Sequence, residues 1–178
     1  MGSDIDLAKR LGEYLERDVE FETMGFAQLV VALQMGKIDM IISNLNITPE
    51  RAKLIDFSNP YAITTVVPLV IKNNVSAAED INSVEQLEGG QVGVLVGAVY
   101  DVVATQTIPN SIPVYYNTNT DVVIALEQDK IKALITDEPI ARYMKILGKN
   151  IEAVQPQLKN SNYAYAISKD NLTLRDEF

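Results

Sequence analysis

The sequence predicts an α/β protein built as two lobes. Strand-like runs of apolar and β-branched residues alternate with amphipathic helical segments along almost the whole chain, which is the pattern of α/β domains with mainly parallel sheets. Two strand-like runs, at 64–71 and 163–167, connect the two halves. The sequence contains no long Gly/Ser linker between them. We therefore expect two lobes joined by two strand crossings, near Thr65 and Tyr163.

Apolar spacing and capping residues predict the elements of the first part of the chain. Helical spacing indicates a first helix over 4–16 that Asp4 caps, and a second helix that stops at Gly36. Thr48 followed by Pro49 is typical of a helix start. In order, the expected elements are helix 4–16, strand 19–22, helix 26–35, strand 38–42, a helix from 48, a turn at 56–61 and strand 64–71.

The second part of the chain continues the alternation, with glycines at its turns. Gly89 and Gly90 form a turn, and Gly97 ends one strand and opens the next helix. In order, the expected elements are helix 80–87, strand 91–96, helix 97–105, strand 113–116, helix 120–128, strand 133–136, helix 139–147, strands 151–154 and 163–167, and a helix that begins at 172.

Composition excludes several classes of function. The 178 residues include no His and no Cys, so the usual ligands for zinc, copper or iron and the usual nucleophile–base pairs are absent. Fifteen Lys and Arg against 24 Asp and Glu give a net charge of −9, which makes nucleic acid a poor partner. We expect no metal, no cofactor, no nucleic acid and no enzymatic activity. The sequence shows neither a signal peptide nor an apolar stretch of transmembrane length.

The first candidate binding segment follows the strand expected at 38–42. Ser43 and Asn44 end this strand, and a polar turn leads into a helix start that carries Arg51. Amide and hydroxyl donors together with a planar guanidinium suit the bidentate binding of a carboxylate. The alternative is a capped helix whose Arg is a solvated surface group.

Two further candidate segments lie at strand-to-helix transitions. Gly97 precedes a helix N-terminus, where backbone N–H groups can bind an anion, although a plain turn fits the same residues. Asp137 follows a buried strand and precedes the helix begun by Pro139, so it either caps that helix or faces a cleft and pairs with a cation. Ligands of open α/β sheets bind at the carboxyl ends of strands.

Phe26 is a further candidate, because it stands at a helix start. It lies off the inward face formed by Leu29 and Leu33. It either packs onto its own helix as a hydrophobic staple or forms an aromatic wall for a ligand, and the sequence alone favours the staple.

Several stretches of the chain match one protein family in the family's own order. The longest is 36–61, which contains Asn-Ile-Thr-Pro-Glu-Arg-Ala from Asn46 and Asp-Phe-Ser-Asn-Pro-Tyr from Asp56. The shorter ones are 4–8, 33–39, 92–94 and 136–139. Together they resemble the amino-acid-binding proteins of ABC importers, which are family 3 of the extracellular solute-binding proteins. The resemblance implies a periplasmic-binding-protein-like type II fold, in which two α/β lobes hold a ligand between them.

The resemblance also implies lobe bounds and binding roles. Lobe 1 is expected to comprise 1–65 with 164–178, and lobe 2 to comprise 66–163. Arg51 corresponds to the family residue that binds the α-carboxylate of an amino acid, and Asp137 to the carboxylate that binds its α-ammonium group. The other positions that the resemblance places at the ligand are Phe26, Ser43, Asn44, Asn46, Gly97, Ala98 and Val99.

The sequence departs from the family's pattern in three places. Ala98 and Val99 stand where a Thr or Ser is usual, so a hydroxyl contact is lost while backbone N–H groups can still serve. Asn44 stands where Gly or Ser is more usual. The family's first strand would precede Gly2 and its last helices would follow Phe178, so we expect lobe 1 to be incomplete. An exposed sheet edge would then favour oligomerisation or a domain swap.

The function implied is that of a receptor without catalytic activity. It captures an amino acid between its lobes, closes like a Venus flytrap by a hinge motion, and delivers the ligand to a membrane ABC permease. The full-length precursor is expected to carry a signal peptide, and the protein to be periplasmic or extracellular, anchored as a lipoprotein in a Gram-positive bacterium. Two alternatives stay open: a ligand-sensing domain of the same fold from a sensor kinase or receptor, and a non-binding fragment that oligomerises. The sequence does not identify the amino acid.

Overall fold

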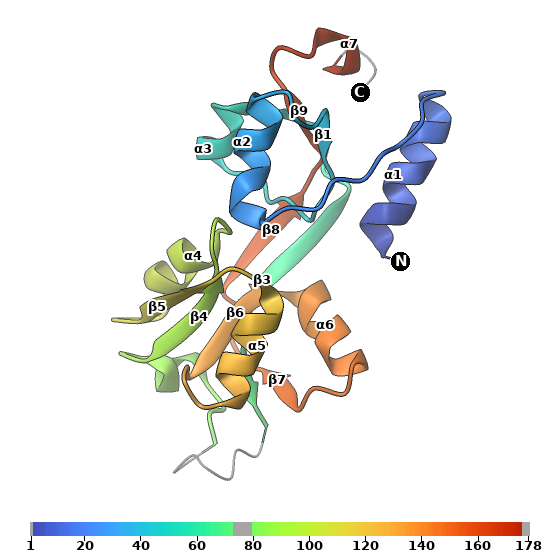
Figure 1. The fold of residues 1–178 in the computed structure, drawn as a ribbon. Coiled ribbons are helices and arrows are strands. Elements are labelled where there is room, and N and C mark those ends of the chain that lie inside the picture. The colour runs from blue at the N-terminus through green and yellow to red at the C-terminus, as the bar shows by residue number, and fades with distance from the viewer. Residues whose placement is uncertain (1, 73–79, 176–178) are drawn as a thin grey trace. The chain divides into compact units, whose positions relative to one another are not determined.

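The computed structural model describes residues 2–72 and 80–175 (Figure 1). The chain divides into two compact units: unit 1 comprises Met1–Ile63 and Asn162–Phe178, and unit 2 comprises Thr64–Ser161. The chain crosses between the units in two strands, β3 (Ala62–Ile71) and β8 (Lys159–Tyr163), which pair with each other. The predicted α/β class with two strand crossings is therefore confirmed.

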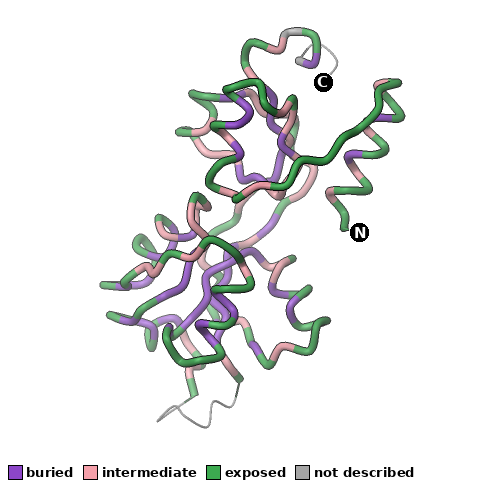
Figure 2. Tube along the Cα trace, in the orientation of Figure 1, coloured by how far each residue is buried: buried purple, intermediate pink, exposed green. Residues whose placement is uncertain are grey.

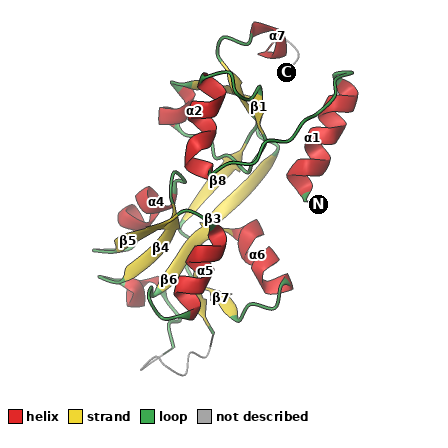
Figure 3. Cartoon of the chain, viewed as in Figure 1, coloured by secondary structure: helices red, strands yellow, loops and turns green. Residues whose placement is uncertain are grey.

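Helices and strands alternate along most of the described chain (Figure 3). The remaining elements of unit 1 are α1 (Ser3–Tyr14), the 3₁₀ turn η1 (Phe26–Gln28), α2 (Leu29–Gln34), β1 (Met40–Ile41), α3 (Pro49–Ala52), β2 (Ile55–Phe57), β9 (Ala166–Ser168) and α7 (Leu172–Arg175). The remaining elements of unit 2 are the 3₁₀ turn η2 (Val84–Leu87), β4 (Gln91–Leu95), α4 (Tyr100–Thr107), β5 (Ile112–Tyr116), α5 (Asn119–Glu127), β6 (Ala133–Asp137), α6 (Glu138–Ile146) and β7 (Ile151–Ala153). None of the described helices is long and apolar enough to cross a membrane.

Unit 1 is built on a small antiparallel sheet in the order β1-β9-β2. Helix α2 packs on this sheet through its apolar stripe, and Gly36 ends the helix in the left-handed conformation (φ 66°) as predicted. The Lys37 N–H then donates to the carbonyl of Ala32 at 3.0 Å, which closes the last turn. The buried residues of this core are Leu29, Leu33, Ile41, Leu45, Ile55 and Ala166.

Several predictions for unit 1 are wrong. The segment 19–22 is extended and exposed rather than a strand, because no described strand pairs with it, and alternation of apolar and polar residues alone supplies no hydrogen-bonding partner (Figure 2). Asp4 lies inside α1, whose N-cap is Gly2, and it makes no capping bond there. The turn expected at 56–61 begins later, because Asp56 and Phe57 pair with β9.

Unit 2 contains a mixed sheet in the order β5-β4-β6-β3-β7. Strand β4 runs parallel to β5 and β6, whereas β3 runs antiparallel to β6 and β7. The expectation of mainly parallel sheets is therefore wrong for both units. In unit 2 the reason is topological: β3 enters the sheet directly from unit 1, so no helical crossover sets its direction.

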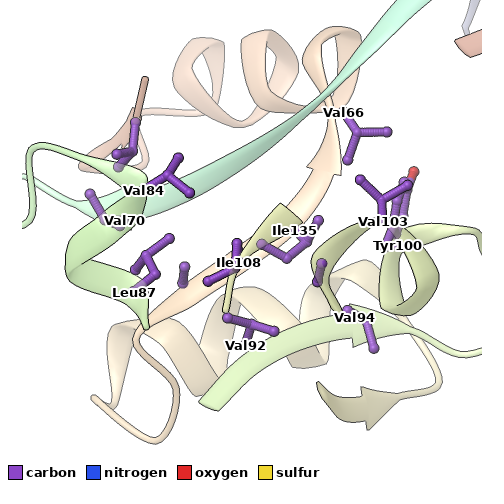
Figure 4. Packing of buried hydrophobic residues seen from close by; sticks show 13 residues of the cluster. Val66, Val70, Val84, Leu87, Val92, Val94, Tyr100, Val103, Ile108 and Ile135 are labelled. Atoms are coloured by element: carbon purple, nitrogen blue, oxygen red, sulfur yellow. The ribbon is translucent and has the colours of Figure 1, made fainter. Parts of the chain in front are cut away.

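Helices cover both faces of the unit 2 sheet, as the alternation of its side chains requires. Val66 and Ile135 face α4, whereas Val67 and Leu134, one residue away in each strand, face α5 and α6. Each such buried aliphatic side chain contributes about 1.5–3 kcal/mol by leaving water. The α4 face is drawn in Figure 4, and its labelled members are Val66, Val70, Val84, Leu87, Val92, Val94, Tyr100, Val103, Ile108 and Ile135.

The ends of several elements differ from the sequence prediction by one to three residues. The helix expected at 80–87 is reduced to the 3₁₀ turn η2, which begins at Val84. The larger difference is at 163–167, where the structure has two strands: β8 ends at Tyr163 and β9 begins at Ala166. The two intervening residues carry the chain from one sheet to the other. Of the predicted C-terminal helix, α7 is described as far as Arg175, and the remaining residues lie outside the described part of the chain.

Candidate functional site

In unit 1 the candidate residues gather on the turn that follows β1. Asn44 adopts a left-handed conformation (φ 48°), and the Asn46 side chain is buried. The next residues are tied to the strand that returns from unit 2: Asn46 forms a β-bridge with Tyr163, and the Ile47 N–H donates to the carbonyl of Asn162 at 3.0 Å. We call residues 43–46 the binding turn. Its conformation is fixed by long-range backbone bonds.

Arg51 is held by the helix start that the sequence predicted. Thr48 caps α3, because its Oγ1 accepts from the Arg51 N–H at 3.1 Å, and Pro49 occupies the first helical position. The guanidinium Nη1 donates to the carbonyl of Asn46 at 2.7 Å. Its carbon lies 5.7 Å from the ring centroid of Phe26, which is within the range of a cation–π contact. The half-buried Arg51 is thus fixed between a carbonyl and an aromatic face, and is no fully solvated surface group.

Two residues of unit 1 that the sequence did not single out contact the binding turn. The Asn44 N–H donates to Oδ2 of Asp4 at 3.0 Å, and the Tyr61 hydroxyl lies 3.4 Å from both Oδ1 of Asp4 and Oδ1 of Asn44. The Tyr61 ring stacks on Tyr165, with centroids 5.0 Å apart. The sequence predicts a helix cap at Asp4 and a turn residue at Tyr61, and it assigns neither of them to the binding site. Their only signal was that both lie in stretches matching the family.

In unit 2 the candidate carboxylate of Asp137 lies at the end of β6. Its side chain is fully buried, and Oδ2 accepts a hydrogen bond from the Tyr100 hydroxyl at 3.0 Å. Asp137 occupies the N-cap position of α6, but its side chain makes no capping hydrogen bond. Burial, and then the adjacent Asp137 charge, raise the pKa of Tyr100, so its hydroxyl stays protonated and donates. Tyr100 is a contact of this site that the sequence did not reveal.

Gly97 and its neighbours form a loop before α4. The prediction that Gly97 opens the helix is wrong, because its φ of 80° lies in the left-handed region and α4 begins at Tyr100. Val99 takes the N-cap position, and the Ala98 N–H donates to the carbonyl of Leu95 at 3.2 Å. The loop therefore leads directly into the residue that contacts Asp137.

The structure sorts the predicted residues into two groups of opposite charge. Unit 1 brings Phe26, Asn46 and Arg51 together, with Ser43 and Asn44 on the same turn. Unit 2 holds a buried carboxylate at Asp137. A guanidinium suits a carboxylate, and a buried carboxylate suits an ammonium or another cation. Among the described residues there is no cluster of carboxylates suited to a metal ion.

Known proteins are similar to this chain in sequence. A Campylobacter jejuni protein named "Probable histidine-binding protein" is 32% identical over 154 residues, which cover 86% of this chain and 57% of that protein. ABC transporter arginine-binding protein 1 of Escherichia coli is 28% identical over 99% of this chain and 72% of its own length. The chain thus spans between about half and three quarters of the length of these two relatives.

Solved structures agree with these relatives. Holo ArgBP from T. maritima has a TM-score of 0.88 at 28% identity, over 99% of this chain and 76% of that one. The amino acid ABC transporter substrate-binding protein AbpA from Streptococcus pneumoniae, solved bound to L-arginine, has a TM-score of 0.88 at 29% identity, over 99% and 74% of the two chains. These likenesses confirm the type II periplasmic-binding-protein fold that the sequence predicted.

The profile of one family covers the chain from end to end, at residues 1–178. That family consists of binding proteins, which is the class that the sequence predicted in place of an enzyme. The chain belongs to the bacterial extracellular solute-binding proteins, family 3.

Proposed function

We propose that this chain binds an L-amino acid as an extracytoplasmic receptor and passes it to an ABC permease. The proposal is carried by two charged groups, a fixed guanidinium at Arg51 in unit 1 and a buried carboxylate at Asp137 in unit 2. An amino acid at neutral pH presents the complementary pair, an α-carboxylate and an α-ammonium group. We propose that Arg51 binds the α-carboxylate and that Asp137 binds the α-ammonium group.

The surroundings of Arg51 support its role as the carboxylate-binding residue. A guanidinium is planar and has five N–H donors, and the bond from Nη1 to Asn46 together with the Phe26 ring fixes its plane. A fixed plane lowers the conformational entropy that binding must remove, which favours bidentate recognition.

Arginine is the ligand to test first. Arginine-binding proteins of Escherichia coli and Bacillus subtilis are among the relatives, and AbpA was solved with L-arginine. Relatives named for histidine and glutamine make those amino acids the next candidates. Neither Arg51 nor Asp137 selects a side chain, since both charges address the part that all amino acids share.

A thermal-shift screen of the whole chain against the twenty standard amino acids tests this proposal. We expect one amino acid, L-arginine first, to raise the melting temperature. A ligand at 100 times its Kd adds about 2.7 kcal/mol of apparent stability. The matched control is Arg51→Ala, which should melt at the same temperature with and without the ligand. A screen in which no amino acid shifts the wild type at millimolar concentration would refute the proposal.

Tyr100→Phe tests whether the hydroxyl that contacts Asp137 supports binding. A hydrogen bond to a charged group contributes about 1.5–3 kcal/mol, so we expect the Kd for the amino acid to rise at least about tenfold. Tyr115→Phe is the matched control, because the Tyr115 hydroxyl donates to an exposed carboxylate, Oδ2 of Asp101, at 3.1 Å. Calorimetry of both variants decides: equal affinities would show that Tyr100 contributes only packing.

A further inference from the structure

We infer that Asp4 is a positioning residue of the binding turn. Its carboxylate holds the Asn44 backbone, and Tyr61 contacts both residues. Asp4 thereby affects ligand affinity through the turn and without contacting the ligand. The inference deepens the proposed function and rests on it for the link to affinity. The local part, the hold of Asp4 on Asn44, rests on contacts within unit 1 alone.

The main contact joins residues far apart in the sequence. Asp4 lies in the first turn of α1, and its Oδ2 accepts from the Asn44 N–H at 3.0 Å across 40 residues of chain. Asn44 is in the left-handed conformation, which is unfavourable for residues other than glycine although Asn tolerates it better than most. An ionised acceptor makes a stronger hydrogen bond than a neutral one, and this bond offsets the cost of that conformation.

Tyr61 forms a second support. Its hydroxyl reaches Oδ1 of Asp4 and Oδ1 of Asn44, each at the long distance of 3.4 Å, so each bond is weaker than the one from Asn44 to Asp4. The residue itself is fixed, since its N–H donates to the carbonyl of Tyr163 at 2.9 Å and its ring stacks on Tyr165. We therefore expect Asp4 to have the larger effect of the two.

The binding turn is thus held on both flanks. On one side the Ala164 N–H donates to the carbonyl of Leu45 at 3.1 Å, and on the other Asp4 holds Asn44. Asn46 follows immediately, and its carbonyl accepts from Arg51. Because only Leu45 separates Asn44 from Asn46, we expect release of Asn44 to loosen the carbonyl that orients the guanidinium, even though the backbone bonds of Leu45 and Ile47 remain.

The burial of Asp4 indicates a specific contact with the binding turn and not an incidental contact at the surface. The carboxyl is half-buried, and burial raises its pKa, while the bond from the Asn44 N–H opposes that rise. Asp6 offers a natural comparison: it lies in the same first turn of α1, is exposed, and has the same charge. Any effect of helix-dipole charge applies to both residues, whereas only Asp4 contacts Asn44.

The affinity arm of the test uses L-arginine as the probe and calorimetry as the measurement. We expect Asp4→Ala to raise the Kd about tenfold, the lower limit for the loss of one hydrogen bond to a charged group. Asp4→Asn keeps one oxygen acceptor for the Asn44 N–H and should lose less than about threefold. Tyr61→Phe should fall between them, and Asp6→Ala should match the wild type.

The second arm measures hydrogen exchange of the Asn44 amide without ligand. A general loss of stability would speed exchange at many amides and not at Asn44 alone. In Asp4→Ala this amide should exchange at least tenfold faster, while the amide of Ile47, bonded to Asn162, keeps its rate. Asp4→Asn should restore the protection. If Asp4→Ala fails to fold, the same comparison between Asp4→Asn, Tyr61→Phe and Asp6→Ala decides.

The two arms separate the possible failures. If the wild type binds no amino acid, the proposed function falls, and the exchange arm still decides whether Asp4 holds Asn44. An unchanged Asn44 exchange rate in Asp4→Ala overturns the positioning role. Faster exchange with an unchanged Kd overturns the link from that position to the ligand.

Discussion

Replacing Arg51 with Ala is expected to abolish amino-acid binding at ordinary ligand concentrations, because the Kd should rise on the order of 100-fold or more. Removing one partner of a hydrogen-bonded charge pair costs about 2–5 kcal/mol, and every 1.4 kcal/mol is about tenfold in affinity. Arg51→Lys should recover only part of this loss, because an ammonium keeps the charge but lacks the planar fork. Calorimetry with L-arginine and with the best ligand from the screen gives the measurement.

The control for Arg51 must separate binding from folding, because its Nη1 also bonds the carbonyl of Asn46. Arg142→Ala is matched in chemistry: it removes an exposed guanidinium that pairs with Glu138 on α6. Melting curves without ligand show whether either variant loses stability. An Arg51→Ala protein that melts normally and still binds with wild-type affinity would rule out the carboxylate assignment.

Asp137→Asn is expected to weaken the binding of amino acids strongly and the binding of their des-amino analogues only slightly. The side chain is fully buried, and an Asn oxygen can still accept from Tyr100, so the change removes the charge and keeps the shape. Loss of a buried charge partner for the α-ammonium group should cost about 2–5 kcal/mol. 5-Guanidinopentanoic acid, which is arginine without its α-amino group, should bind the variant and the wild type about equally.

Glu138→Gln controls for the loss of one negative charge at the start of α6. This residue follows Asp137 directly and pairs with the exposed Arg142, so its neutralisation changes the helix N-terminus but not the buried carboxylate. We expect Glu138→Gln to leave the affinities for arginine and for 5-guanidinopentanoic acid unchanged. If Asp137→Asn weakens arginine and its des-amino analogue by the same factor, Asp137 does not contact the ammonium group.

Local features of the fold were predictable where the cause is local. The cap of α3 by Thr48, the stop of α2 at Gly36 and the alternation of helices and strands in unit 2 each depend on residues a few positions apart. The strand expected at 19–22 failed for the opposite reason. An alternating pattern describes a segment that can pair, whereas pairing needs a second strand that the segment itself does not specify.

The sequence by itself determined the family, the α/β class and the two opposite charges proposed to bind a zwitterion. Only the tertiary structure decided which distant residues contact the binding turn and Asp137. Asp4 bonds to Asn44 across 40 residues, and Tyr100 bonds to Asp137 across 37. No local pattern encodes either contact, because each needs two separate segments to be brought together by the packing of apolar faces. Periodicity and capping fix a segment's form, and burial of those faces then selects which polar groups meet.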